Sequence, residues 1–371
     1  MRQEAYRNQL FGGCSCCRPV APDVNRRNFL KGAATAGFTA SIAGGLEASM
    51  PALAQTGTRG LIDVHHHIVP PFYLAENRER IAGSRGGEIT RAWLEWTPQQ
   101  ALASMDKHGV TTAVISLSTP GVWFGNAQQA RSTARRFNDY AAELAKSHPG
   151  RFGLFAAVPL PDTEGSLNEI EYAYDVLKAD GIGLLTSYGD KWLGDPDYKP
   201  VFEELNRRKA VVFVHPTTPN CCRTLMPGIS TIIAEVPHDT TRSVMSLLFS
   251  GSFSRFADIR FIFCHAGGTI PTLATRFSQY GPRDLAEKVP NGVDYELKRL
   301  YYDIAVSGHR PAISALAAFA PMSQILFGSD YPYRDLAETA GTINQLGISA
   351  VDLQAIGQNN ALALLPQLRA T

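Results

Sequence analysis

Histidine and aspartate residues stand at the ends of several short apolar segments of this 371-residue chain. The first such segment ends in three consecutive histidines, and later ones end in single polar residues: His65-His66-His67, then His215, His265 and Asp330. Side chains alternate between the two faces of a strand, so His65 and His67 share one face while His66 points away, toward covering helices. Two imidazoles on one face can chelate a metal ion. Imidazole with carboxylate suits Zn²⁺, with Mn²⁺ or Fe²⁺ as alternatives.

The apolar segments themselves predict the strands that must position these side chains. Near-continuous apolar runs are typical of parallel strands covered on both faces. The predicted strands are residues 61–67, 112–117, 152–158, 182–186, 211–215, 260–265, 300–306 and 325–329. Helical patterns alternate with them, and one is bounded by Thr97-Pro98 at its start and Gly109 at its end. Further helices are predicted at about residues 126–147, 167–179 and 195–209.

Eight such units predict a (β/α)₈ barrel, an α/β fold of the TIM-barrel type. The rival fold is a doubly wound open sheet, which loses support because no Gly-x-Gly-x-x-Gly motif follows the first strand. A barrel brings the carboxyl ends of all its strands to one rim. We therefore expect His65, His67, His215, His265 and Asp330 to meet there. A single histidine at a strand end is more often a loop anchor, so the prediction depends on the joint pattern.

The first 54 residues have the pattern of an export signal. Arg26-Arg27 is followed by Phe29-Leu30-Lys31, a weakly apolar stretch and the small-residue site Ala52-Leu53-Ala54. The paired arginines resemble the twin-arginine signal, although Asn25 stands where Ser or Thr is usual. We expect residues 1–54 to be this signal, residues 55–371 to be one catalytic domain, and the product to be periplasmic or secreted. The alternative is a disordered basic N-terminus on a cytoplasmic enzyme.

The composition is that of a globular protein without a global charge. Hydrophobic residues make up 44%, and 35 Lys and Arg stand against 34 Asp and Glu, so no basic field favours nucleic acid. No apolar run is long enough for a spanning helix, so we expect no membrane insertion. Three of the six cysteines lie in the leader, which leaves too few for a disulfide framework.

Four motifs together resemble the amidohydrolase superfamily, and in particular its decarboxylase branch. That branch includes aminocarboxymuconate-semialdehyde, γ-resorcylate and 6-methylsalicylate decarboxylases. The resemblance spans about residues 61–332, and residues 181–222 look most like the 6-methylsalicylate group. The motifs are Asp63-x-His65-x-His67, Val214-His215-Pro216, Cys264-His265-Ala266-Gly267-Gly268 and Gly328-Ser329-Asp330-Tyr331-Pro332.

The resemblance implies roles for the rim residues. One divalent ion, Zn²⁺ first and Mn²⁺ as the alternative, would be bound by the set His65, His67, His215 and Asp330. His265 would be the catalytic acid–base beside it, with Asp330 counted as catalytic too. The carbamylated lysine of two-metal relatives has no counterpart here, because residues 183–186 contain no lysine.

Substrate contacts are less well defined by the motifs. The aminocarboxymuconate enzymes have a substrate-binding arginine before the second strand, whereas residues 99–105 here contain none. Arg242 is a possible replacement, although it could equally be a helix-surface arginine. Trp123 and His238 are further candidates. Other aromatic residues after the first two strands, among them Tyr73, Trp93 and Trp96, could hold a planar ligand or belong to the core.

The first functional hypothesis is therefore decarboxylation of a small aromatic or unsaturated hydroxy-carboxylic acid. The second is hydrolysis of a lactone or amide by the same single-metal site, because the ligand set does not separate the two reactions. A third is a barrel that binds a small ligand without catalysis. The resemblance also implies a homo-oligomer, and the leader implies the twin-arginine export machinery as a partner.

Overall fold

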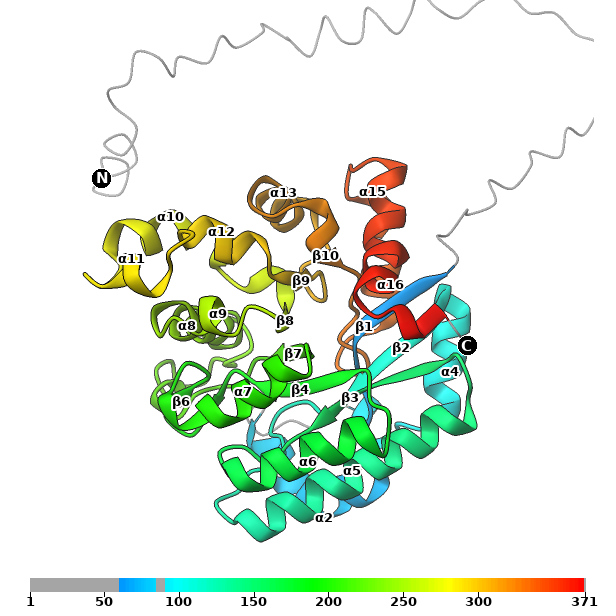
Figure 1. Ribbon diagram of the computed structural model, residues 1–371. Helices are drawn as coiled ribbons and strands as arrows, with labels where there is room; N and C mark the ends of the chain where they lie inside the picture. Colours follow the sequence, from blue (N-terminus) through cyan, green and yellow to red (C-terminus); the bar gives the residue numbers. More distant parts are fainter. Residues whose placement is uncertain (1–59, 85–90, 370–371) are drawn as a thin grey trace, which may run out of the picture. The chain divides into compact units, whose positions relative to one another are not determined.

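Eight parallel strands form one sheet that curves into a barrel (Figure 1). The computed structural model describes residues 60–84 and 91–369, so the predicted leader lies outside the described residues. The sheet order follows the chain: β1-β2-β3-β4-β7-β8-β9-β10. The strands are β1 (Leu61–His67), β2 (Val110–Ser116), β3 (Phe152–Ala157), β4 (Gly181–Leu185), β7 (Val211–His215), β8 (Arg260–Phe263), β9 (Tyr301–Asp303) and β10 (Ile325–Leu326).

The first and last strands of the sheet are joined by backbone hydrogen bonds. Val64 N donates to Phe327 O at 3.1 Å, and Asp330 N donates to His65 O at 2.8 Å. A parallel bridge also pairs His66 with Tyr331. These bonds connect β1 to the residues that directly follow β10. The predicted (β/α)₈ barrel is confirmed, and the open doubly wound sheet is wrong.

Helices follow the strands and cover the outside of the barrel (Figure 1). A short hairpin, β5 (Ser187–Tyr188) with β6 (Lys191–Trp192), follows β4. The first helices are α2 (Pro71–Ser84), α3 (Arg91–Leu94), α4 (Pro98–His108), α5 (Ala127–Ser147), α6 (Thr163–Asp175) and α7 (Lys199–Arg207). The later ones are α8 (Glu235–Phe249), α9 (Ser252–Arg255), α10 (Ile270–Tyr280), α11 (Leu285–Lys288), α12 (Val293–Lys298), α13 (Arg310–Phe319), α14 (Leu336–Ala340), α15 (Ala350–Gln354) and α16 (Asn360–Leu364).

Helix boundaries that the sequence marks with a capping residue are the ones it predicts well. The Thr97 hydroxyl accepts from Gln100 N at the start of α4, and Gly109 ends that helix with a φ of 75°. The Asn126 side chain caps α5 in the same way. The helix predicted at residues 167–179 is wrong in its bounds. Asp162 accepts from Gly165 N and starts α6 four residues earlier than predicted.

Three strands end two or three residues before the apolar runs that predicted them, and each ends at or shortly before a site residue. β8 stops at Phe263 because His265 has a φ of 57°, and the segment after β10 turns at Asp330, whose φ is 65°. A left-handed backbone cannot continue a strand. β9 stops at Asp303, whose carboxylate accepts the backbone N–H of Ala305. The predicted bounds 260–265, 300–306 and 325–329 therefore extended too far.

Apolar side chains from six strands pack together with the C-terminal helix. This cluster includes Ile62, Val114, Phe155, Phe213, Cys264 and Leu326, with Leu364 and Leu365 beside them. A larger cluster lies between the sheet and the helices and contains the buried Tyr73, Trp93 and Trp96. These three aromatic residues therefore belong to the core.

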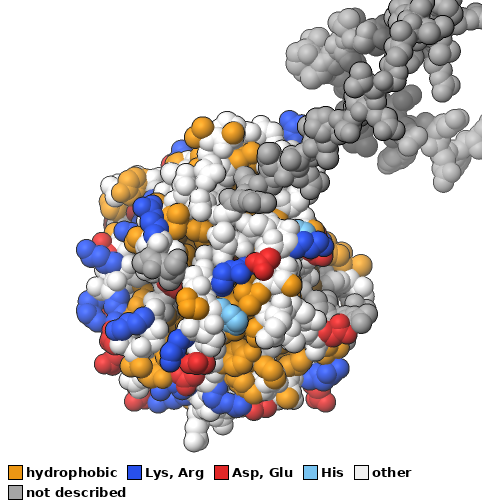
Figure 2. All heavy atoms as spheres, turned by 90° about the vertical axis from the view of Figure 1, so that its right-hand side faces the viewer, with side chains coloured by type: hydrophobic (Ala, Val, Ile, Leu, Met, Phe, Trp, Pro, Cys, Tyr) orange, Lys and Arg blue, Asp and Glu red, His pale blue; other side chains and the backbone are white. Residues whose placement is uncertain are grey.

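The described surface mixes the two kinds of charge. On the face shown in Figure 2, basic and acidic side chains lie side by side, as expected from their nearly equal numbers. Among the residues that the structure describes, none of the helices is both long enough and apolar enough to cross a bilayer.

Candidate active site

Three histidines and one aspartate converge at the carboxyl end of the barrel. One ligand atom from each of His65, His67, His215 and Asp330 lies within 4.8 Å of the others, and all four residues are buried. The Nε2 atoms of His65 and His67 are 3.1 Å apart. Each lies 3.2 Å from Asp330 Oδ1, and His215 Nε2 lies 4.0 Å from the same oxygen. The structure thus brings together the four residues that the sequence proposed as ligands.

Local backbone geometry explains how side chains from separate elements come together in the cluster. His65 and His67 leave the end of β1 toward the cluster, and His215 is the last residue of β7. Asp330 follows β10 in a left-handed conformation with a φ of 65°, fixed by the bond from its N–H to His65 O. Such conformations cost about 1–3 kcal/mol and persist where surrounding contacts hold them, often at functional sites. The surrounding contacts therefore offset the cost of a backbone conformation that places the carboxylate among the imidazoles.

His66 has partners of its own, away from the cluster. Its Nδ1 lies 2.9 Å from Asp63 Oδ2, and its ring stacks on Tyr331 with centroids 4.8 Å apart. His66 is separated from the cluster, as alternation along the strand predicts. Tyr331 lies in the segment that follows β10, so this segment provides one of the contacts of His66.

Burial and neighbouring charges set the protonation of the cluster. Burial lowers the pKa of His67 to about 4 and that of His215 to about 3, so both imidazoles are neutral at pH 7. Burial raises the pKa of Asp330, but the adjacent histidines, His65 first, outweigh it and hold that pKa well below its usual range. Burial lowers the pKa of His65, yet Cys264, Asp303 and Asp330 together raise it well above the ordinary value. The position of His65 thus favours positive charge.

The donor set fits a single divalent cation. Asp330 Oδ1 is buried with no hydrogen-bond partner among the described residues, although two imidazole nitrogens face it. Neutral imidazoles with nitrogens 3.1 Å apart repel through their lone pairs unless a proton or a cation lies between them. Three imidazoles and one carboxylate are ligands that Zn²⁺ and Mn²⁺ accept. The chain therefore has a single-metal site here.

Asp303 orients one ligand and was missed by the sequence reasoning. Its Oδ2 lies 2.9 Å from His65 Nδ1, and its Oδ1 accepts the backbone N–H of His265 at 3.1 Å. A carboxylate behind a ligand histidine fixes the tautomer that points Nε2 at the metal. The available signal was the lone carboxylate in the apolar run 300–306. His65, Cys264 and Asp303 also form a second group of potential ligands, but Cys264 Sγ donates to Val214 O and Asp303 is occupied by His65.

His265 lies beside the cluster without belonging to it. Its Nε2 is 3.7 Å from Asp330 Oδ2, and that nitrogen has no hydrogen-bond partner among the described residues. The ring lies 5.1 Å from the ring of His65, centroid to centroid. The residue begins a short 3₁₀ helix (η4, His265–Gly267) with a φ of 57°. An unpartnered imidazole nitrogen next to the cluster can exchange a proton with a bound molecule.

The three substrate candidates lie in different surroundings. Trp123 lines a cavity at the mouth of the barrel. Arg242 lies in α8 with its guanidinium 3.4 Å from Glu235 Oε2, and His238 is an exposed residue of the same helix. Neither is among the residues that line the mouth cavity.

The mouth cavity measures about 250 Å³ and is formed by residues that follow β2, β4 and β7. Leu185, which lines it, pairs in register with His215. The loops after β2 and β7 meet there, since Thr119 Oγ1 lies 3.0 Å from Thr217 Oγ1. The lining residues are Pro120, Trp123, Phe124, Gly125, Leu185, Ser187, Tyr188, Gly189, Thr217, Thr218, Asn220 and Arg223.

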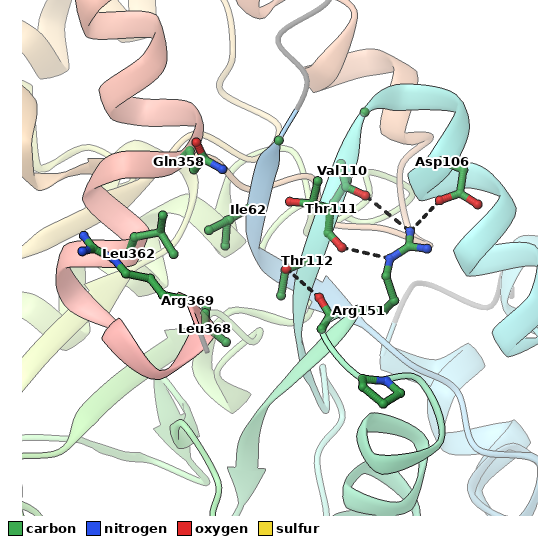
Figure 3. Close-up of a pocket in the computed structure, with 14 residues that line it drawn as sticks. Ile62, Asp106, Val110, Thr111, Thr112, Arg151, Gln358, Leu362, Leu368 and Arg369 are labelled. Atoms are coloured by element: carbon green, nitrogen blue, oxygen red, sulfur yellow. Dashed lines mark hydrogen bonds and ion pairs between the residues drawn. The ribbon is translucent and has the colours of Figure 1, made fainter. Parts of the chain in front are cut away.

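A larger cavity, of about 790 Å³, lies at the opposite end of the barrel, where β1 and β2 begin (Figure 3). Arg151 extends into it, but its guanidinium donates to Asp106 Oδ1 at 2.7 Å and to Thr111 O at 2.9 Å. Figure 3 shows Ile62, Leu362 and Leu368 along its other side. None of the clustered histidines lines it, and catalytic residues of such barrels lie at the other rim.

Comparison with known proteins places this geometry in a family. The amidohydrolase family model matches residues 62–367. The chain is 36% identical over 327 residues to the 6-methylsalicylic acid decarboxylase acuB of Aspergillus aculeatus, covering 83% of this chain and 96% of that protein. It is 34% identical over 326 residues to the decarboxylase macB of Penicillium terrestre, covering 83% and 95%. A dihydroxybenzoic acid decarboxylase of Polaromonas, solved with manganese and 2-nitroresorcinol, superposes with a TM-score of 0.72 at 21% identity, covering 83% and 97%.

Proposed function

The chain belongs to the amidohydrolase family, in its decarboxylase branch, and from that premise we propose that it removes the carboxylate of a 2-hydroxybenzoic acid such as 6-methylsalicylate. The observation that carries this proposal is the buried cluster of three histidines and Asp330, with the unpartnered nitrogen of His265 beside it. The enzyme is thus a metal-dependent carboxy-lyase for small aromatic acids. The similarity to 6-methylsalicylic acid decarboxylases supports the choice of substrate.

We assign the metal to His65, His67, His215 and Asp330. When bound, a divalent cation supplies positive charge that stabilises oxygen anions of the substrate. The imidazole-rich donor set favours Zn²⁺, and Mn²⁺, found in the related dihydroxybenzoic acid decarboxylase, is the alternative. Elemental analysis of the purified protein decides between them.

His265 is assigned as the proton donor. The imidazolium gives its Nε2 proton to the ring carbon that bears the carboxylate, and the ring loses its aromaticity in that step. The bond between this carbon and the carboxylate then breaks, CO₂ leaves, and the electron pair returns to the ring. His265 regains its proton from solvent. The buried Asp330, 3.7 Å from His265 Nε2, stabilises the positive charge on the imidazolium.

Isotope labelling tests the reaction. In D₂O, 6-methylsalicylate should yield CO₂ and 3-methylphenol with one deuterium at the vacated carbon. His265→Asn should keep its metal yet lose about 10²–10⁴ in turnover, the usual contribution of a positioned acid–base group. A product that keeps all its carbon and carries solvent oxygen, traced with ¹⁸O water, would replace the decarboxylase by the hydrolase of a lactone or amide.

We further propose export through the twin-arginine machinery and assembly into a homo-oligomer. The Arg26-Arg27 pair and the Ala52-Leu53-Ala54 site support a periplasmic or secreted enzyme. Five large apolar side chains are exposed in a stretch of nine residues between β7 and α8, and they support the oligomer: Leu225, Met226, Ile229, Ile232 and Ile233. Light scattering of the purified protein should give a mass above that of one chain.

A further inference from the structure

The mouth cavity combines aromatic walls with a single charged side chain. Trp123 and Phe124 contribute flat apolar surface, and Arg223 is the one charged residue among those that line the cavity. An aromatic acid presents the same two features, a planar apolar ring and one negative charge. The cavity is therefore chemically complementary to the ionised form of such an acid.

The charge of Arg223 is available to a ligand. Its Nε donates to Asn220 Oδ1 at 3.3 Å, a neutral acceptor, and no carboxylate of the described residues pairs with it. Arg242, the arginine that the sequence suggested, is instead opposed by Glu235 at 3.4 Å. Arg223 is exposed, so it can meet a ligand in solvent before the ligand reaches the buried cluster.

The cavity lies at the same end of the barrel as the cluster, and some of its lining residues are close in sequence to His215. Thr217 and Thr218 line it two and three residues after His215. Ser118 Oγ, on the loop after β2, lies 3.4 Å from His215 Nε2, and Pro120, two residues later, lines the cavity. The loops that form the cavity thus also contact the cluster.

We propose that Arg223 is a specificity-determining residue that selects the ionised aromatic acid as it enters the site. This inference rests on the proposed function for the identity of the substrate, but the charge selection is separate from the chemistry at His265. Arg223 acts on capture and not on the later C–C bond cleavage. Its loss therefore lowers kcat/KM and leaves kcat unchanged.

The test compares an anion with its neutral isostere. Benzoate and benzamide have nearly the same shape, and binding of each to the metal-loaded protein can be followed by calorimetry. Arg223→Gln should weaken benzoate about tenfold and leave benzamide unchanged, because only the charge-assisted contact is lost. Arg223→Lys should retain most of the benzoate affinity. Arg207→Gln, which removes an arginine from α7 outside the cavity, is the matched control and should change neither.

Salt provides a second readout. Raising the ionic strength from about 0.02 M to about 0.5 M should weaken benzoate binding to wild type and have much less effect on Arg223→Gln. If Arg223→Gln weakened the binding of benzoate and benzamide equally, Arg223 would have a structural role. If it weakened the binding of neither, Arg223 would have no role in binding. Either result overturns the proposal. The binding assay involves no turnover. The labelling experiment could therefore fail while Arg223 still favours benzoate over benzamide. That outcome would reject the proposed reaction and keep the inference about Arg223.

Discussion

At the scale of single residues, the site depends on which nitrogen of each histidine faces the cluster. Asp303 accepts from His65 Nδ1, and Ser116 Oγ lies 3.0 Å from His67 Nδ1, so both rings turn Nε2 toward Asp330. Fixed tautomers remove the entropy cost of orienting the ligands when the metal binds. Loss of such a polar partner typically lowers metal affinity by about 10–100-fold.

Substitution of His67 and of its neighbour His66 distinguishes a metal ligand from a structural residue. His67→Ala should lose most of the bound metal, because it removes one of four donors. His66→Asn should keep about one metal ion per chain, since His66 bonds Asp63 and stacks on Tyr331 instead. Metal content by elemental analysis, with circular dichroism to confirm folding, checks both. Similar metal loss in the two variants would contradict the assignment.

The sequence could predict the cluster because strand ends in a barrel meet at one rim, so residue type and position were sufficient. It could not predict Asp303 as the partner of His65, because a side-chain contact between β9 and β1 leaves no periodic signal. Arg223 was missed for a similar reason. It lies in the long segment between β7 and α8, whose path is not set by apolar periodicity.

At the scale of elements, glycine lets η4 approach α8 closely. A Cβ on Gly268 would overlap Pro237 O of α8, and Thr241 Oγ1 there already bonds Thr269 N at 3.0 Å. This contact holds the turn that carries His265. The sequence showed Gly267-Gly268 but not the helix against which they pack, since α8 was not among the predicted helices.

A matched pair of glycines tests this packing. Gly268 and Gly189 have nearly equal φ values, 65° and 66°, but a Cβ on Gly189 would have no atom within 4 Å. Alanine at Gly189 should cost about 1–2 kcal/mol, the cost of a left-handed conformation. Alanine at Gly268 should cost about 1–3 kcal/mol more, because backbone must move and because its ψ of −117° lies outside the left-handed region open to alanine. Urea denaturation measures both free energies of unfolding. Equal losses of unfolding free energy would mean that η4 and α8 can move apart enough to accept a side chain.

At the scale of the whole molecule, we propose that residues 1–54 direct export and that the barrel carries the site. The leader predicts that the folded, metal-loaded enzyme leaves the cytoplasm, because a twin-arginine signal is an address and not an anchor. Replacing both arginines, Arg26→Lys with Arg27→Lys, should retain the protein in the cytoplasm. Cell fractionation checks this, and the exported wild type should begin at Gln55. If the two proteins distribute alike between the fractions, the export proposal fails.

Metal removal should weaken the closure of the barrel without unfolding it. The ligands come from β1, from β7 and from the segment after β10, so one ion connects the first and last parts of the sheet. The bonds Val64–Phe327 and Asp330–His65 hold the same junction in its absence. An ion present at about 100 times its Kd adds about 2.7 kcal/mol to the free energy of unfolding. For a domain of this size, that corresponds to a fall in Tm of about 4 °C on chelation.

Calorimetry of wild type and His67→Ala, each before and after chelation, separates this effect from others. Chelation should lower the Tm of wild type and leave that of His67→Ala unchanged, because the variant lacks the site. Re-addition of Zn²⁺ or Mn²⁺ should restore the wild-type value. Far-UV circular dichroism should stay native-like throughout, since the backbone bonds between β1 and the β10 segment remain. An equal fall in both proteins would mean that the chelator acts elsewhere, and loss of the dichroism signal would mean that the metal, not the backbone, closes the barrel.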